Sequence, residues 1–330
     1  MTTASVTPGR AASAVRPGQR RARRRRLVVV AGMLAPALLG LVVFFVYPLL
    51  ASIYYSFTSY NLLSPPQWIG LRNYTYLFTQ DPNVLTAALN TLWFVVIMVP
   101  IKLAFSFAVA GLLARARRSS GVWRTLFYLP ALVPPVASVV AFVFLFNPGT
   151  GPVNLILKWF GIHQGPLWFN DPNLSKPSLL LLAIWVMGDV MIIFLAGLLD
   201  VPRELYEASS LDGANGPQKL RYVTIPAMVP VLIFSVVTGV IAALQYFTEA
   251  AVASSTANGQ ATVGGGGSSV LGYPDNSLLT YTLWLYERGF NDFQLGYASA
   301  LAVLLFLVAT VFLVLLLRKV KAFMPEEATT

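Results

Sequence analysis

Six long runs of apolar residues dominate this sequence, and each is long enough to cross a lipid bilayer as a helix. Crossing about 30 Å of hydrocarbon takes roughly 20 predominantly apolar residues in an α-helix. The runs cover residues 27–50, 86–113, 123–146, 177–199, 226–250 and 295–317. A membrane strand needs only about 10 residues of alternating polarity, so these runs are too long to be strands. We therefore predict an all-α, polytopic membrane protein with six transmembrane helices.

The composition agrees with a chain that uses the bilayer as part of its solvent. The 330 residues are 56% hydrophobic and 11% charged, whereas a soluble domain is about 45–50% apolar and about 25% charged. The net charge of +10 lies mainly in an arginine-rich tail and between the runs, which argues against nucleic-acid binding. There is no cysteine, and the single His163 falls in a loop, so we predict no metal site and no catalytic residue.

Lysine and arginine are concentrated on one side of the predicted helices. Eighteen lie in the N-terminal tail, in the segments after the second and fourth runs, and in the C-terminal tail, whereas four lie in the opposite loops. The positive-inside rule then places both termini in the cytoplasm. The first run is longer than the apolar core of a signal peptide, so we predict an anchored first helix rather than a cleaved signal.

The six runs divide the chain into four parts. These are a disordered basic cytoplasmic tail (1–26), a first helix with its outer loop (27–85), a core of five helices (86–317) and a second cytoplasmic tail (318–330). The longest outer loop, 251–294, contains a glycine run at 264–267 that is typical of a flexible linker. Its residues 277–290 predict a short interfacial helix, with Asp275, Asn276 or Ser277 as the cap.

The segment 200–226 is too polar to cross the membrane and too rich in helix signals to be a loose loop. Pro202 suits the first turn of a helix, and Gly213 can adopt the left-handed conformation that ends one. Pro217 opens a second short helix, with Asn215 or Gly216 at its cap. The segment predicts two short helices at an angle, joined at Gly213, with Pro226 as the junction to the fifth span.

One pattern within this segment is specific. Glu207-Ala208-Ser209, three residues, Gly213, nine residues and Val223-Thr224-Ile225-Pro226 resembles the EAA loop of binding-protein-dependent ABC importer permeases. That loop reads Glu-Ala-Ala, three residues, Gly, nine residues, Ile, one residue, Leu-Pro. The spacing matches throughout, and three positions depart conservatively, namely Ser209, Val223 and Ile225.

Other short motifs extend the resemblance over most of the chain. They are Gly70-Leu71-Arg72-Asn73-Tyr74, Asn90-Thr91, Trp185 with Leu195-Ala196-Gly197-Leu198, and Gly296-Tyr297-Ala298-Ser299-Ala300-Leu301. Together they are similar to the maltose/glycerol-3-phosphate permease family of sugar importers, which implies a methionine-importer-like ABC permease fold. The chain departs from this family in a longer glycine-rich insertion at 256–272.

The resemblance implies that segment 200–226 docks into a cleft on an ATPase subunit. The implied coupling residues are Glu207, Ala208, Ser209, Leu211, Asp212, Gly213, Ile225 and Pro226. Glu207 would make the charged contact, Gly213 would shape the turn, and Ala208 and Leu211, which with Leu205 form an apolar stripe, would supply the packing face. The alternative is a capped helix pair that merely connects two spans.

The resemblance also implies partners and a location. The partners are a second homologous permease, distinct or identical, an ATPase dimer and an extracytoplasmic solute-binding protein, all at a bacterial inner membrane. The chain lacks a Gly-x-x-x-x-Gly-Lys-Ser/Thr loop. We therefore expect no cofactor and no enzymatic activity on this chain, with ATP and Mg²⁺ on the ATPase. The resemblance leaves open which sugar is imported.

Charged residues inside the apolar runs are candidates for function, because an ionisable group in lipid costs a few kcal/mol or more. Lys102 and Asp189 both lie about 15–17 Å from the cytoplasmic ends of their runs at 1.5 Å per residue, so we hypothesise an ion pair. Separate polar partners, or snorkelling into an aqueous cavity, are the alternatives.

Sugar sites combine aromatic faces with hydrogen-bonding side chains. The candidates for the substrate pathway are Trp185, Asp189, Gln245, Tyr246 and Glu249. Packing against lipid or other helices is the alternative for each aromatic residue, and Asp189 keeps both assignments. The alternative function is a proton- or ion-coupled secondary carrier, which would use buried carboxylates and show internal repeats and broken helices.

Overall fold

The computed structural model describes residues 17–115, 120–259 and 271–321. The chain divides into two compact units, Met1–Tyr54 and Tyr55–Thr330. The division falls before the first outer loop, whereas the sequence analysis grouped that loop with the first helix. The predicted glycine linker at 264–267 lies outside the described residues.

The first unit is helical throughout its described part. Helix α1 (Pro17–Leu41) continues through the π turn η1 (Val42–Val46) into α2 (Tyr47–Ser56). The stretch Val29–Ser56 is long and apolar enough to cross a membrane. The prediction of a disordered tail over 1–26 is wrong from Pro17 onward, because arginine is a good helix former and this segment extends the first span.

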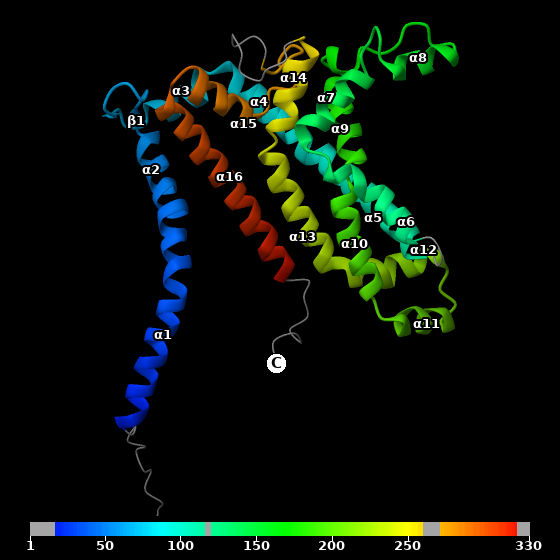
Figure 1. Cartoon of the computed structure of the whole chain (residues 1–330), viewed down its shortest axis with the longest axis horizontal. Coiled ribbons are helices and arrows are strands. Elements are labelled where there is room, and N and C mark those ends of the chain that lie inside the picture. The colour runs from blue at the N-terminus through cyan, green and yellow to red at the C-terminus, as the bar shows by residue number, and fades with distance from the viewer. Residues whose placement is uncertain (1–16, 116–119, 260–270, 322–330) are drawn as a thin grey trace, which may run out of the picture. The chain divides into compact units, whose positions relative to one another are not determined.

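The second unit is also almost entirely helical (Figure 1). It begins with the two-residue strands β1 (Thr58–Ser59) and β2 (Gln67–Trp68), which pair antiparallel, and with α3 (Arg72–Thr79). The second span comprises α4 (Pro82–Trp93), the π turn η2 (Phe94–Met98) and α5 (Val99–Arg115). The last span is α16 (Leu295–Lys321). Among the described residues of the whole chain, four helices could cross a membrane, or up to six if each of two bent pairs is one span.

Prolines explain most of the π turns in the described helices. The turns η1, η2 and η5 (Leu220–Thr224) each end two residues before a proline, namely Pro48, Pro100 and Pro226. A proline within a helix has no N–H to donate, and its ring clashes with the carbonyl four residues earlier. Widening the preceding turn relieves this clash without ending the helix.

The predicted third span, 123–146, is a bent pair. It consists of α6 (Ser120–Tyr128), the 3-10 turn η3 (Leu129–Leu132) and α7 (Pro135–Leu145), and the two parts meet at 95°. The break has a local cause, because Pro134 and Pro135 are consecutive and neither donates a backbone hydrogen bond. The residue before a proline is also driven out of the helical region.

The predicted fourth span, 177–199, is also broken. Helices α9 (Ser175–Trp185) and α10 (Gly188–Asp200) meet at 48°. Gly188 lies so close to the backbone of Phe127 and Tyr128 that a Cβ would clash with them. The missing side chain therefore lets the start of α10 press against the end of α6.

The predicted fifth span, 226–250, has different ends in the structure. Its helix begins with α12 (Gly216–Lys219), passes through η5 into α13 (Ile225–Leu244) and stops there. Residues 245–247 are not helical, and α14 (Thr248–Ala257) follows. Pro226 therefore lies within a continuous helix and is not a junction, because η5 accommodates it.

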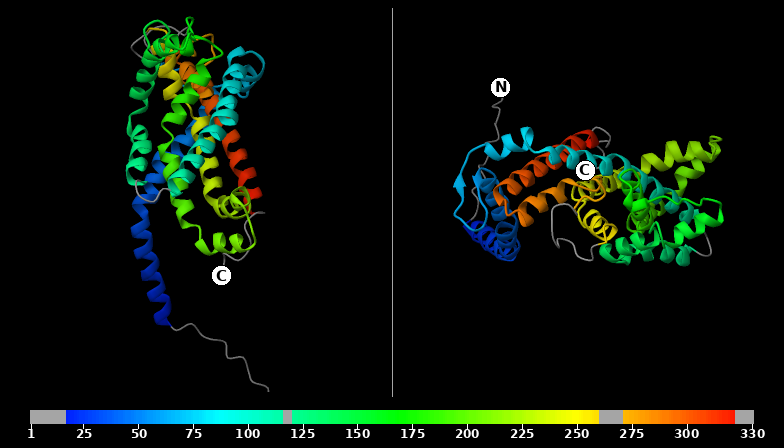
Figure 2. Two further views of the ribbon diagram at one scale, coloured as in Figure 1. Left: turned by 90° about the vertical axis from the view of Figure 1, so that its right-hand side faces the viewer. Right: turned by 90° about the horizontal axis from the view of Figure 1, so that it is seen from above.

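The connections at the end of this unit opposite α11 (Arg203–Leu211), which we call the outer connections, fold onto the helices (Figure 1). One carries α8 (Pro152–Trp159) and η4 (Trp168–Asn170), and the other carries α15 (Tyr281–Tyr286) and the π turn η6 (Glu287–Asn291). The predicted interfacial helix at 277–290 is instead largely buried and is capped by Thr280. Figures 1 and 2 place α8 and α14 at the end of this unit opposite α11 (Arg203–Leu211).

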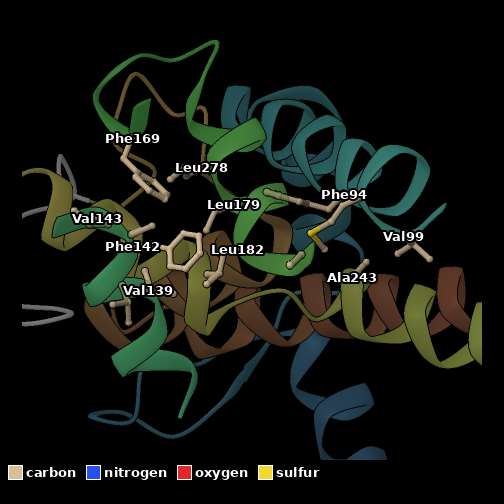
Figure 3. Packing of buried hydrophobic residues seen from close by; sticks show 14 of the residues in the cluster. Phe94, Val99, Val139, Phe142, Val143, Phe169, Leu179, Leu182, Ala243 and Leu278 are labelled. Carbon is tan, nitrogen blue, oxygen red and sulfur yellow. The ribbon is translucent and has the colours of Figure 1, made fainter. Parts of the chain in front are cut away.

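Three buried apolar clusters hold the second unit together. The largest joins the second span with α7, α9 and α13, and Phe142 of α7 lies next to Leu179 and Leu182 of α9 within it (Figure 3). A second cluster joins α4, α14, α15 and α16 around Leu283 and Leu301. The third packs α5, α10 and α13 around Phe194 and Met228.

Candidate functional site

A cavity of about 590 Å³ lies where the three helix breaks meet. Val133 and Pro135 line it from the first break, Val186 and Asp189 from the second, and residues 245–249 from the third. Helix breaks leave backbone groups unpaired, and at membrane depth such backbone is tolerated only when it is buried in protein or lines a water-filled cavity. The cavity therefore gives the broken spans a common explanation.

The hypothesised ion partners are in contact in this cavity. Lys102 Nζ lies 3.3 Å from Asp189 Oδ1, and both residues belong to the lining. Their side chains are 24% and 57% exposed, so the pair faces the cavity rather than a dry core. The two assignments that the sequence left open for Asp189 are thus compatible in the structure.

The third break supplies most of the remaining polar lining. Gln245, Tyr246, Thr248 and Glu249 all line the cavity. The Tyr246 ring also packs on the Phe94 ring with centroids 4.7 Å apart, which fixes one of its faces. Three predicted pathway residues, Gln245, Tyr246 and Glu249, therefore line the same cavity as Asp189.

Trp185 does not belong to this group. It is 41% exposed, does not line the cavity, and its ring lies 5.3 Å from the Phe142 ring. The helix break that follows Trp185 explains this, because α9 and α10 differ in direction and the residues on either side of the break face differently. A continuous helix, as predicted, would have placed Trp185 and Asp189 on the same face.

A second candidate site lies at the other end of α10, in the predicted coupling segment. Helix α11 begins after Pro202 and ends at Leu211, with Asp212 as its C-cap. Gly213 has a φ of +76°, the left-handed conformation that glycine adopts without strain. Asn215 caps α12 through a reciprocal pair of hydrogen bonds with Gln218.

Helix α11 exposes the residues to which the resemblance assigns docking. Glu207 and Ala208 are exposed, and Leu205 and Leu211 are 47% and 90% exposed. An apolar stripe that the described part of the chain leaves uncovered is available to a partner. Of the other predicted coupling residues, Asp212, Gly213, Ile225 and Pro226 are also exposed, and Ser209 is half-buried.

The opposite face of α11 is tethered to the start of the fifth span. The Tyr206 hydroxyl lies 3.0 Å from Thr224 Oγ1, and Lys219 Nζ donates to Ser210 Oγ at 2.6 Å. The sequence analysis assigned no role to Tyr206, Ser210 or Lys219. A signal for Tyr206 was present, because it is the aromatic residue on the side of the helix away from Glu207 and Leu211.

The two candidate sites are joined through continuous chain. Helix α10 carries Asp189 near its start and leads into α11 at its end. Helices α12 and α13 then run without a break to Leu244, next to Gln245. The chain therefore connects α11 directly to two walls of the cavity.

The broken helices do not favour the alternative carrier function. The sequence analysis treated broken helices as a mark of a secondary carrier, and three breaks occur in the described spans. In this chain, however, the breaks occur together with helix α11, whose exposed apolar stripe would have no use in such a carrier. The comparisons with known proteins separate the two functions more directly.

A family model described as "Binding-protein-dependent transport system inner membrane component" matches residues 102–322. The chain is 37% identical to the probable ABC transporter permease protein YesP of Bacillus subtilis, over 86% of this chain and 87% of that protein. It is 32% identical to the lactose transport system permease protein LacF of Rhizobium radiobacter, over 84% and 89%. A bacterial ABC transporter involved in the import of the acidic polysaccharide alginate has the same fold, with a TM-score of 0.75, 20% identity, and coverage of 93% of this chain and 100% of that one.

Proposed function

Because the chain belongs to the family of binding-protein-dependent transport system inner membrane components, we propose that it is the permease subunit of an ATP-driven importer that carries a sugar into the cytoplasm. One observation carries this proposal, namely that the exposed helix α11, called the lever below, is connected at both ends to helices that line a substrate-sized cavity. Helix α11 connects α10 with α12–α13, and both of these reach the lining of the cavity.

The chemistry of the cavity supports a sugar as the substrate. Its volume of about 590 Å³ lies within the range of roughly 300–1,000 Å³ that small-molecule sites occupy. Amide, hydroxyl and carboxylate groups accept and donate hydrogen bonds to sugar hydroxyls, and the ring of Tyr246 offers an aromatic face. Relatives named for arabinooligosaccharide, lactose and diacetylchitobiose transport favour a disaccharide or short oligosaccharide.

The energy would come from a separate ATPase dimer that grips α11. Glu207 would meet a basic group of the ATPase, and the stripe of Leu205, Ala208 and Leu211 would enter its cleft. ATP binding would close the dimer and pull α11, and the movement would pass along α10 and α13 to the cavity walls. Hydrolysis would then reset the lever, with ATP and Mg²⁺ held entirely by the ATPase.

The remaining partners complete the import route. A second, homologous permease would form the other half of the pathway, and an extracytoplasmic solute-binding protein would deliver the sugar at the end opposite α11. The lysine and arginine distribution supports a cytoplasmic position for α11 and both termini.

A reconstitution experiment tests this function. The tagged chain is co-expressed with its partner permease and ATPase subunits, and the purified complex is reconstituted in lipid vesicles together with the binding protein. Uptake of labelled lactose and arabinooligosaccharides is then measured. We expect uptake that requires ATP and the binding protein. Uptake that persists without ATP and collapses when a proton ionophore is added would instead establish the secondary carrier.

A further inference from the structure

The carbonyl of Tyr246 is held by two threonines from a distant part of the chain. Thr280 Oγ1 donates to Tyr246 O at 2.7 Å, and Thr282 Oγ1 donates to the same oxygen at 3.0 Å. The carbonyl belongs to the third helix break, where the α13 helix has ended, and the two hydroxyls that donate to it lie 3.3 Å from each other. Tyr246, together with Phe247, supplies the aromatic lining of this part of the cavity.

The segment that provides these threonines is itself firmly fixed. Asn90 Nδ2 donates to the carbonyls of Asn276 and Leu279 at 2.8 and 2.9 Å, and the Tyr281 N–H donates to Thr91 Oγ1 at 2.8 Å. Further contacts attach it to the outer end of α9 through Ser277 and Ser175, whose hydroxyls lie 2.7 Å apart. Residues 277–281 are all buried.

We propose that Thr280 and Thr282 are positioning residues for the substrate cavity, which set the place of Tyr246, Thr248 and Glu249 by fixing the Tyr246 carbonyl to the outer segment 276–282. This inference deepens the proposed function, on which it rests. The N–H groups of Gln245 and Tyr246 bond back to α13, and the Phe247 carbonyl accepts from Ala251 of α14, whereas the Tyr246 carbonyl is bonded by the two threonine hydroxyls. The two hydroxyls are the side-chain donors that the structure shows at this carbonyl.

The geometry also gives the outer segment a part in transport. The segment contacts α4, α9 and, through the Tyr281 hydroxyl, the Leu301 carbonyl of α16 at 3.1 Å. Any movement of these helices at their outer ends is therefore carried to the Tyr246 carbonyl. The cavity wall thus receives input from the outer end through the threonines as well as from the inner end through α13.

The absence of cysteine from the sequence allows a direct test. Single cysteines are introduced at Thr248, beside the break, and at Thr238, on the α13 wall of the same cavity, in the transporter assembled with its partner subunits in lipid nanodiscs. The rate of labelling by a small charged thiol reagent is measured with and without Thr282→Val. Thr282→Ser restores the hydroxyl, and Thr310→Val on α16, whose hydroxyl bonds only within its own helix at Phe306, is the matched control.

We expect Thr282→Val to change the labelling rate at position 248 by about three- to tenfold, the shift in equilibrium that the loss of one hydrogen bond produces. The rate at position 238 should stay unchanged, and Thr282→Ser should restore the original rate at 248. An unchanged rate at 248, an equal change at both positions, or the same change in Thr310→Val would overturn the inference. Because labelling needs no transport, uptake by the unmodified transporter tests the proposed function separately.

Discussion

The fifth span is preceded by a connection that contains α11 and followed by one that contains segment 276–282. The two connections differ in how far the rest of the chain covers them and forms hydrogen bonds to them. On the inner side, α11 bonds to the start of the fifth span through Tyr206, which contacts Thr224, and Ser210, which accepts from Lys219, and it exposes its apolar stripe. On the outer side, residues 277–281 are buried, backbone groups of segment 276–282 bond to α4, and two of its threonine side chains bond to the third helix break. The inner connection is therefore built to be completed by another protein, whereas the outer one is completed by its own chain.

The two regions also treat their carboxylates differently. Glu204, Glu207 and Asp212 of the inner connection are exposed. In the outer region, Asp81 accepts hydrogen bonds from the Trp284 indole at 2.9 Å and the Tyr297 hydroxyl at 2.7 Å, and Glu287 is 2% exposed. The comparison predicts that outer substitutions damage stability and inner ones damage coupling.

The largest expected effect is on stability, from Asn90→Leu. This change leaves the buried carbonyl of Leu279 without its side-chain donor, whereas the Asn276 carbonyl keeps the Leu279 N–H, and an unsatisfied buried group costs about 1–3 kcal/mol. We expect the free energy of unfolding to fall by about 1–3 kcal/mol, measured by denaturation of the purified complex in detergent. Asn83→Leu, about two turns earlier on the same face of the helix but only half-buried, is the control, and equal losses in both variants would contradict the distinction between the regions.

The inner connection is tested by Glu207→Arg. Reversing an exposed charge should leave the unfolding free energy within about 0.5 kcal/mol of the original. If Glu207 meets a basic group of the ATPase, uptake and ATPase attachment should fall by about 30-fold or more, since a central interface residue is worth about 2 kcal/mol. Glu204→Arg, in the first turn of the same helix, is the matched control. Unchanged attachment in Glu207→Arg would remove the lever from the mechanism.

These two regions also show what the sequence could predict. The six apolar runs, the capped helix before Gly213 and the contact between Lys102 and Asp189 follow from length, periodicity and spacing, which are local properties of the chain. The breaks in the third to fifth spans were missed for different reasons. Pro134 and Pro135 signalled the first break, but an apolar window of about 20 residues does not register a bend.

The other two breaks depend on contacts that a single sequence does not reveal. Gly188 permits the close approach of α10 to the backbone of Phe127, and the break at Tyr246 is stabilised by threonines 34 and 36 residues later. Trp185 was assigned to the substrate pathway only because the fourth span was treated as one straight helix. Exposure of the α11 stripe likewise depends on what the rest of the chain leaves uncovered.

The ion pair between the two regions sharpens the comparison, because Lys102 and Asp189 belong to the cavity that both connections reach. Lys102→Met and Asp189→Leu are combined in a double-mutant cycle with uptake as the measurement. Because the pair is partly exposed, we expect a coupling energy of about 0.5–1 kcal/mol, roughly a two- to fivefold departure from additivity. Additive losses would mean that the 3.3 Å contact does not matter for transport.

The smallest expected effect is a dependence of stability on pH that arises in the outer region alone. Burial raises the pKa of Glu287, although the Asn291 amide, which donates to Glu287 Oε2 at 2.7 Å, opposes the shift. A carboxyl whose pKa is higher in the folded state binds its proton more tightly there. The resulting stabilisation is therefore fully present below the ordinary carboxyl pKa and is lost as the pH rises through the raised value.

The variant Glu287→Gln tests this dependence, because it keeps an acceptor for Asn291 and removes the titration. We expect its unfolding free energy to vary less over this pH window and to differ from the original by less than about 1 kcal/mol at neutral pH. An unfolding free energy that varies with pH as steeply in Glu287→Gln as in the unmodified protein would contradict the assignment of this titration to Glu287.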